Sequence, residues 1–168
     1  MGSFANHLKY EIEVVPTKVI EVAPIEVKAQ YNPDRFRQWQ SLHVGGPYQV
    51  LNIAFSPHVY FLTRYEETGN YTSGLRKSRY YKMHRLYGKK KEWIEKKAEA
   101  FIALYEFIKG GGEPSERISI LRTPIVPNIF NKGYEVYEGH HRLSIYYVLD
   151  VPKIKVDLLN LLINFTVN

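Results

Sequence analysis

The stretch from Lys91 to Lys109 constrains the fold of this 168-residue chain more than any other. Its apolar residues recur at spacings of three and four, which places them on one side of an α-helix, and Lys and Glu occupy the other side. The apolar set is Ile94, Ala98, Phe101, Ile102, Tyr105 and Ile108. Three glycines follow at 110–112, and glycine can adopt the positive φ angle that ends many helices. We therefore expect a long amphipathic helix that covers an apolar surface.

Segments with the residue pattern of β-strands lie on both sides of this helix. They are residues 10–15, 19–22, 48–55, 118–121, 125–126, 134–137 and 154–158, with 59–62 as either a strand or an aromatic packing segment. Pro16 and Pro24 interrupt the first region, which indicates strands partly at a sheet edge. Shorter helices are expected at 78–86 and 141–149. This order predicts an α+β fold with a small mixed sheet.

The composition excludes several classes of protein. The chain has no cysteine, so disulfides, thiolate zinc sites and cysteine nucleophiles are ruled out. No run approaches the roughly 18 consecutive apolar residues of a membrane helix, and the N-terminus has no secretion signal. We therefore expect a soluble, cytoplasmic protein without membrane contact. Its length suits a single domain, residues 1–168, around one apolar core.

Positive charge is concentrated in one segment. The whole chain carries a net charge of +6, but residues 76–99 alone hold ten Lys or Arg against three Glu, so this segment carries +7. Such a field suits an anionic partner, which includes a nucleotide, a nucleic acid through residues 76–97, or an anionic surface. The structural alternative is a solvated helical face crossed by ion pairs.

Between the strand at 134–137 and the helix at 141–149 lies the run Glu138-Gly139-His140-His141-Arg142. The first N–H groups of a helix have no acceptor within the helix, and the helix dipole places partial positive charge there. Gly139 lets the backbone approach a bound group closely, and Arg142 can grip two phosphate oxygens at once. This junction therefore predicts a phosphate site.

A structural interpretation of the same run is also available. Gly139 then only turns the chain, the two histidines form local hydrogen bonds, and Arg142 pairs with a surface acid. The four other histidines are scattered along the sequence, and we expect them to be surface or packing residues. They are His7, His43, His58 and His84.

Three segments occur in a recognisable order: residues 124–126 (Pro-Ile-Val), 134–143 with the Gly-His-His-Arg turn, and 151–156 beginning Val-Pro. This order resembles the ParB/sulfiredoxin superfamily, in which a Gly-x-x-Arg turn at a helix N-terminus binds phosphate. The resemblance implies a core at about 75–160, preceded by a strand-rich extension at about 8–74. Members differ in reaction, so the fold implied by the resemblance does not by itself name an activity.

The subgroups of this superfamily can be compared at single positions. Sulfiredoxins carry a reactive cysteine where His140 stands, and this chain has none. Partition proteins continue into a helix-turn-helix domain, which we do not expect in the ten residues after position 158. The acid-Gly-His-His-Arg form is most similar to members that resemble free-serine kinases. Those also carry a catalytic acid ahead of the long helix, where this chain is basic; Glu66 and Glu67 are the nearest acids, and the general base is unassigned.

The resemblance implies a nucleotide-dependent phosphotransferase or nucleotide hydrolase that uses ATP, ADP or CTP with Mg²⁺. The expected phosphate-binding residues are Gly139, His140, His141 and Arg142, with Arg76 and Lys77 as a basic clamp on the far side. The expected catalytic residues are Glu138, His140 and His141, and Glu138 is also the expected metal ligand.

Two other classes of function stay open. One is a nucleic-acid-binding or nuclease module, in which residues 76–97 follow a polynucleotide backbone. Its aromatic residues then either stack on bases or pack beneath the basic helix. They are Tyr80, Tyr81, Tyr87 and Trp93. The other class is a protein-interaction platform that keeps the fold without the reaction.

Overall fold

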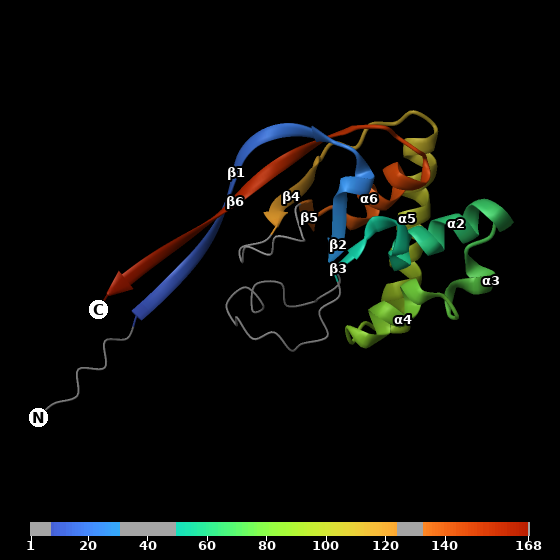
Figure 1. The fold of residues 1–168 in the computed structure, drawn as a ribbon. Coiled ribbons are helices and arrows are strands. Elements are labelled where there is room, and N and C mark those ends of the chain that lie inside the picture. Colours follow the sequence, from blue (N-terminus) through green and yellow to red (C-terminus); the bar gives the residue numbers. More distant parts are fainter. Residues whose placement is uncertain (1–7, 31–49, 124–132, 168) are drawn as a thin grey trace, which may run out of the picture.

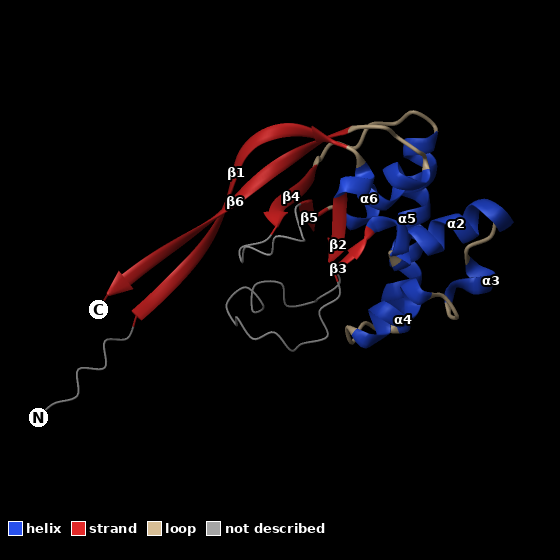
Figure 2. Cartoon of the chain, in the orientation of Figure 1, coloured by secondary structure: helices blue, strands red, loops and turns tan. Residues whose placement is uncertain are grey.

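The computed structural model describes residues 8–30, 50–123 and 133–167, and these form a mixed α+β fold, as expected. The strands make one six-stranded mixed sheet in the order β1-β6-β4-β5-β2-β3. The helices gather together to one side of the strands (Figures 1 and 2). The strands are β1 (Leu8–Val22), β2 (Val27–Gln30), β3 (Val50–Asn52), β4 (Ile118–Thr123), β5 (Gly133–Glu138) and β6 (Ile154–Val167). The helices are η1 (Pro24–Glu26), η2 (Ile53–Phe55), α2 (Pro57–Thr68), α3 (Thr72–Leu75), α4 (Arg79–Leu86), α5 (Lys91–Lys109) and α6 (His140–Val148).

Strands from the two ends of the chain share this sheet. β1 runs antiparallel to β6 at one edge, and the outer half of this pair extends away from the helices (Figure 1). β6 and β4 are parallel, β4 and β5 antiparallel, β5 and β2 parallel, and β2 and β3 antiparallel. The N-terminal strands therefore flank strands β6, β4 and β5, which come from the C-terminal half.

The prediction of two short strands within residues 10–22 was wrong, because β1 is one continuous strand. Its register shifts between Pro16 and Lys18, which accommodates a residue that cannot donate a backbone hydrogen bond. The expected position at a sheet edge is confirmed, and an edge is where proline is tolerated. β6 continues well past the predicted end at residue 158 because it pairs with β1 along its whole length.

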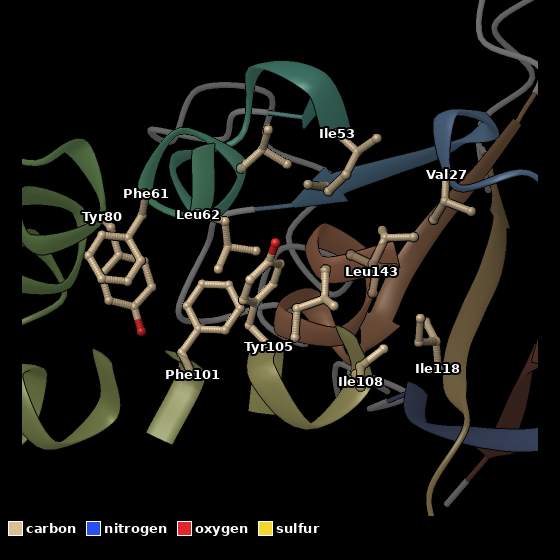
Figure 3. Packing of buried hydrophobic residues seen from close by; sticks show 14 of the residues in the cluster. Val27, Ile53, Phe61, Leu62, Tyr80, Phe101, Tyr105, Ile108, Ile118 and Leu143 are labelled. Carbon is tan, nitrogen blue, oxygen red and sulfur yellow. The ribbon is translucent and has the colours of Figure 1, made fainter. Parts of the chain in front are cut away.

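Helix α5 has the predicted bounds, and its six predicted apolar residues are all buried. It packs with α2 and α4 through aromatic rings that Figure 3 shows grouped together. The ring centroids of Phe61 and Tyr80 lie 4.9 Å apart, and those of Tyr80 and Phe101 lie 5.7 Å apart. The same core includes Leu143 and Ile145, both fully buried, so α6 is anchored by its apolar side. This anchoring fixes the start of α6 relative to α2 and α4.

Residues 59–62 form part of a helix, so the strand alternative was wrong, whereas the aromatic packing alternative holds for Phe61, which is buried and stacks on Tyr80. Ser56 accepts a hydrogen bond from the Val59 N–H at 3.1 Å, and Pro57 occupies the first helical turn, so α2 begins here. The strand predicted at 48–55 is shorter, because the Asn52 side chain accepts from the Ala54 N–H at 3.0 Å and starts a 3-10 turn. Residues 125–126 lie outside the described part.

Among residues placed in the structure, no helix is long and apolar enough to cross a bilayer.

Candidate functional site

The junction between β5 and α6 has a backbone conformation that requires glycine. Gly139 has a φ of 99°, in the left-handed region that residues with a side chain rarely adopt. A Cβ atom at this position would lie 3.1 Å from Cγ1 and 3.3 Å from Cα of Ile118 on β4. The first bond of α6 follows, from the Leu143 N–H to the Gly139 carbonyl at 2.9 Å. Glycine therefore lets α6 start directly against β4.

The first turn of α6 begins after a residue that has no side chain to cap it. Ser56 and Ser78 accept hydrogen bonds from the first turns of α2 and α4, whereas the residue in the same position before α6 is Gly139. The amides of residues 140–142 precede the first bond within the helix and carry the positive end of its dipole. This is the backbone geometry predicted for a phosphate site.

This turn forms one wall of a cleft of about 1040 Å³ that opens to solvent. α5 supplies the facing wall with Lys97, Ala100, Phe101, Leu104 and Phe107, which are spaced along one side of that helix. Further walls come from α2, α4 and residues 113–116. The cleft therefore joins a polar end at the turn to an apolar wall on α5.

Four imidazole rings from three helices meet in this cleft: His58 on α2, His84 on α4, and His140 and His141 on α6. His58 lies at the centre, with ring centroids 4.7 Å from His141, 6.1 Å from His140 and 6.3 Å from His84. His58 and His84 are 3% and 9% exposed. The sequence analysis singled out His140 and His141 in this cluster. It expected His58 and His84 to be surface or packing residues, and their burial confirms the packing alternative.

Tyr80 fixes the orientation of one of these imidazoles. Its ring is fully buried, and its hydroxyl lies 3.0 Å from Nε2 of His141. Burial raises the pKa of Tyr80, so the hydroxyl keeps its proton and can donate to a neutral imidazole nitrogen. The alternative in which this tyrosine packs beneath the basic helix is the correct one. Trp93, in contrast, is 42% exposed.

Three of the imidazoles, those of His58, His84 and His141, are uncharged near neutral pH. Burial, followed by the charges of neighbouring imidazoles and Lys97, lowers the pKa of His58 well below 6.5. Burial and Lys97 have the same effect on the pKa of His141. For His84, burial with Lys97 and Lys89 lowers the pKa to about 4. The floor of the cleft is therefore a set of neutral hydrogen-bonding groups.

Arg142 is the buried cation of the turn, with its side chain only 14% exposed. Its guanidinium is 3.4 Å from the Glu116 carboxylate, and it also donates to the Glu116 backbone carbonyl. The Glu116 side chain is 82% exposed, so its contribution to the pair is small and an incoming anion can replace it. The arrangement holds Arg142 at the cleft wall, ready to bind an anionic group.

Glu138 lies at the rim of the same cleft and is exposed. The described residues contain no group of three or more His, Asp or Glu side chains placed to hold a metal ion. Mg²⁺ often binds through one or two carboxylates together with substrate phosphates. The single carboxylate of Glu138 fits that mode of binding and does not form a complete metal site.

Arg76 and Lys77 lie apart from the turn. They line a separate depression of about 840 Å³ with residues of α3 and α5, and neither residue lines the imidazole cleft. Arg76 is 64% exposed and its guanidinium lies 3.2 Å from the Glu95 carboxylate. The structure therefore does not bring the predicted basic clamp to the phosphate site; Lys97 is the lysine that lines the cleft.

The sequence contains one signal for His84, which the sequence analysis did not assign to the site. Tyr80 and His84 are four residues apart in a predicted helix, which places them on one face, and their ring centroids lie 4.6 Å apart. His58 had no comparable signal because α2 was not predicted as a helix.

Comparison of the chain with family models, with curated proteins and with solved structures gave no match.

Proposed function

We propose that this chain is a nucleotide-binding protein of the ParB/sulfiredoxin type that transfers or hydrolyses the terminal phosphate of a nucleotide. The observation that carries the proposal is the start of α6 at Gly139, beside Arg142, on the wall of a large cleft. Backbone donors, a helix dipole and a nearly buried guanidinium together favour a phosphate group. The acid-Gly-His-His-Arg turn is most similar to that of the kinase-type members.

The size and walls of the cleft support a nucleotide as the ligand. Its volume of about 1040 Å³ is at the upper end of typical small-molecule sites. The apolar side of α5, with Ala100, Leu104 and Phe107, offers a surface for a base, and Phe107 is 52% exposed. A base on this wall and phosphates at the turn use both ends of the cleft.

Each residue of the turn has a role in this proposal. The amides of residues 140–142 and the Arg142 guanidinium bind phosphate oxygens, after Arg142 exchanges Glu116 for the ligand. Lys97 adds a positive charge from the opposite wall. Glu138 is the carboxylate that would hold Mg²⁺, which neutralises charge that develops on the phosphates. These groups position and stabilise the phosphates.

The experiment is a thermal-shift screen with ATP, ADP, CTP and GTP, each with and without Mg²⁺. A ligand that binds only the folded state raises the unfolding temperature, and one present at 100 times its Kd adds about 2.7 kcal/mol. Arg142→Ala is expected to remove the shift, while the matched variant Arg76→Ala keeps it. Absence of a shift with every nucleotide, or a wild-type shift in Arg142→Ala, would falsify the assignment.

A second candidate is a polynucleotide that places a backbone phosphate at the same turn. It is favoured by Lys97, which belongs both to the basic segment and to the cleft, and by two exposed apolar residues nearby in the sequence, Leu86 at 86% and Trp93 at 42%. Binding of this kind weakens steeply with salt. Salt-dependent binding of single-stranded DNA or RNA, without a thermal shift by free nucleotides, would select this candidate.

A further inference from the structure

The wall that α5 gives to the cleft begins with a cation and ends with an exposed aromatic ring. Burial lowers the pKa of three imidazoles in the cleft, and the charge of Lys97 lowers each of them further, so this lysine lies on their side of the wall. Ala100 and Leu104 follow it along the helix. Phe107 ends the wall, and the rise per residue of a helix places it about 15 Å from Lys97 along the axis. The two ends of this wall therefore offer different chemistry to a ligand.

The end of α5 is closed by a turn of three glycines that also determines where the Phe107 ring lies. The Gly111 N–H donates to the Ile108 carbonyl and the Gly112 N–H to the Phe107 carbonyl, both at 2.9 Å. With Gly111 at a φ of 89°, these two bonds make a Schellman motif. In this motif the residue after the left-handed position often packs an apolar side chain on the residue where Phe107 stands. Here that residue is Gly112, which has no side chain to offer.

The Phe107 ring itself fills the space that a side chain at position 112 would need. A Cβ atom on Gly112 would lie 2.4 Å from Cε2 and 2.5 Å from Cζ of the ring, far closer than van der Waals contact. The ring therefore lies directly against the glycine backbone. Phe107 is still 52% exposed, and it lines the cleft. The turn thus holds an aromatic ring in place and leaves part of it open to a ligand.

Other exposed aromatic residues differ from Phe107 in their surroundings. The guanidinium of Arg79 lies 4.6 Å from the ring centroid of Tyr60, and the ammonium of Lys89 lies 5.1 Å from that of Trp93. Tyr60 and Trp93 are 47% and 42% exposed, and neither lines the imidazole cleft. Of these three exposed aromatic residues, Phe107 is the one that a ligand in the cleft can reach.

We propose that Phe107 is the platform on which the base of the nucleotide stacks, and that Gly112 positions its ring. This inference deepens the proposed function and rests on it. A nucleobase and an aromatic side chain attract each other face to face, and replacing such a side chain by alanine weakens binding about 5- to 150-fold per base. The phosphates then lie toward the turn, within reach of Arg142 and of Lys97 at the opposite end of the wall.

The same wall favours one class of base. Every base has a flat π-face, so stacking alone tolerates all of them. A purine has two fused rings, whereas a pyrimidine has one, so a purine covers more of Phe107 and of its neighbour Leu104 and removes more apolar surface from water. The ligand is therefore a purine nucleotide, and CTP binds more weakly than ATP or GTP.

The experiment compares a nucleotide with a ligand that has phosphates but no base. Affinities for ATP, CTP and inorganic tripolyphosphate, each with Mg²⁺, are measured by titration calorimetry. In Phe107→Ala we expect ATP to bind about 5- to 150-fold more weakly and tripolyphosphate to stay within about twofold of wild type. Phe107→Trp keeps an aromatic face and should keep ATP binding. Unchanged ATP affinity in Phe107→Ala, or an equal loss for tripolyphosphate, overturns the assignment.

Gly112→Ala tests the positioning role while the ring is still present. The φ of Gly112 lies outside the left-handed region, so the added methyl group displaces the ring without straining the backbone. We expect weaker ATP binding and unchanged tripolyphosphate binding. Gly74→Ala is the matched control, because that glycine also lacks a positive φ and nothing lies within 4 Å of the added atom. Wild-type ATP affinity in Gly112→Ala would overturn the role given to Gly112.

The wild-type protein separates this inference from the proposed function. Tripolyphosphate bound as tightly as ATP would leave the phosphate site in place and reject the stacking platform, and CTP bound as tightly as ATP would reject the purine class. Failure to bind all three ligands rejects the proposed function itself. Phe55→Ala is the control for loss of an exposed aromatic ring, since Phe55 is 61% exposed and lies outside the cleft, and it should keep both affinities.

Discussion

Two depressions on this molecule combine basic residues with glutamate, and they differ in how deeply their arginines lie. In the imidazole cleft, Arg142 is 14% exposed and contacts one highly exposed glutamate. In the second depression, Arg76 is 64% exposed and shares the Glu95 carboxylate with Lys91, at 3.2 Å and 3.9 Å. A cation near bulk water is screened by solvent, whereas a desolvated cation interacts strongly with an incoming anion. Burial therefore separates the proposed ligand site from a solvated ion pair.

The two regions also differ in their uncharged groups. The cleft is lined by four imidazoles, and one of them contacts the buried Tyr80, whereas the second depression is lined by charged residues together with Tyr71, Leu75 and two small hydroxyl residues. Neutral hydrogen-bonding groups in a buried region are costly unless they are paired or used by a ligand. The cleft should therefore respond strongly to pH and to single-atom changes, and the second depression should respond weakly.

The largest expected effect is loss of stability in acid. Because the folded state lowers the pKa of His58, His84 and His141, the unfolded state binds more protons as pH falls below 6.5. Stability is therefore fully present above pH 6.5 and is lost toward pH 4, the approximate pKa of His84. His84 alone contributes roughly 3 kcal/mol to this loss. Urea unfolding measured from pH 7.5 to 4.5 gives the slope of the unfolding free energy against pH.

His84→Leu is the matched control for the acid effect. It removes one buried titrating group and also the Nε2 atom that is buried without a hydrogen-bond partner in the described part. The variant should keep its stability at pH 7.5 to within about 1 kcal/mol and lose less of it in acid. A slope equal to that of wild type would show that this imidazole is not part of the buried titrating cluster.

The second-largest effect on stability is expected from adding a methyl group at Gly139. Gly139→Ala combines a positive φ with a contact of 3.1 Å to Ile118, so we expect a loss of roughly 2–4 kcal/mol and loss of nucleotide binding. Gly69→Ala is the control, because Gly69 also has a positive φ, 65°, but nothing lies within 4 Å of the added atom. The control should lose about 1 kcal/mol and keep the nucleotide-induced thermal shift.

The turn could be located from the sequence because its cause is local. A strand, a glycine and an apolar helix follow one another, and the backbone donors of residues 140–142 arise from that order alone. The bounds of α5 were predictable for the same reason, since its apolar period and terminal glycines lie within one segment. Local patterns of this kind predict an element and its bounds.

The remaining members of the site depend on tertiary packing. His58 reaches the cleft only because α2 packs against α6, and the start of α2 depends on the Ser56 cap, which was not recognised in the sequence. Arg76 is separated from the turn because it follows α3 and pairs with Glu95 of α5 in another depression. Spacing along a chain cannot rank the depth of these side chains, and depth is what distinguishes Arg142 from Arg76.

A smaller effect is expected from removing the hydroxyl oxygen that contacts His141 from beneath the cleft. Tyr80→Phe keeps the ring stacked on Phe61 at 4.9 Å but leaves Nε2 of His141 without its hydroxyl partner. The buried nitrogen then lacks a hydrogen bond, so we expect a loss of about 1–2 kcal/mol and weaker nucleotide binding. Tyr60→Phe, at an exposed position, should leave both quantities unchanged. Equal stabilities for Tyr80→Phe and wild type would argue against the hydrogen bond.

The smallest effect is expected at the second depression, and it tests the comparison most directly. Arg76→Ala removes an exposed ion pair with Glu95, so stability should change by no more than about 0.5 kcal/mol. Nucleotide affinity, measured by titration calorimetry at 50 and 300 mM salt, should stay within about twofold of wild type, because Arg76 lies outside the cleft. A loss of affinity comparable to that of Arg142→Ala would mean that Arg76 reaches the phosphates, and depth would then not be what separates the two arginines.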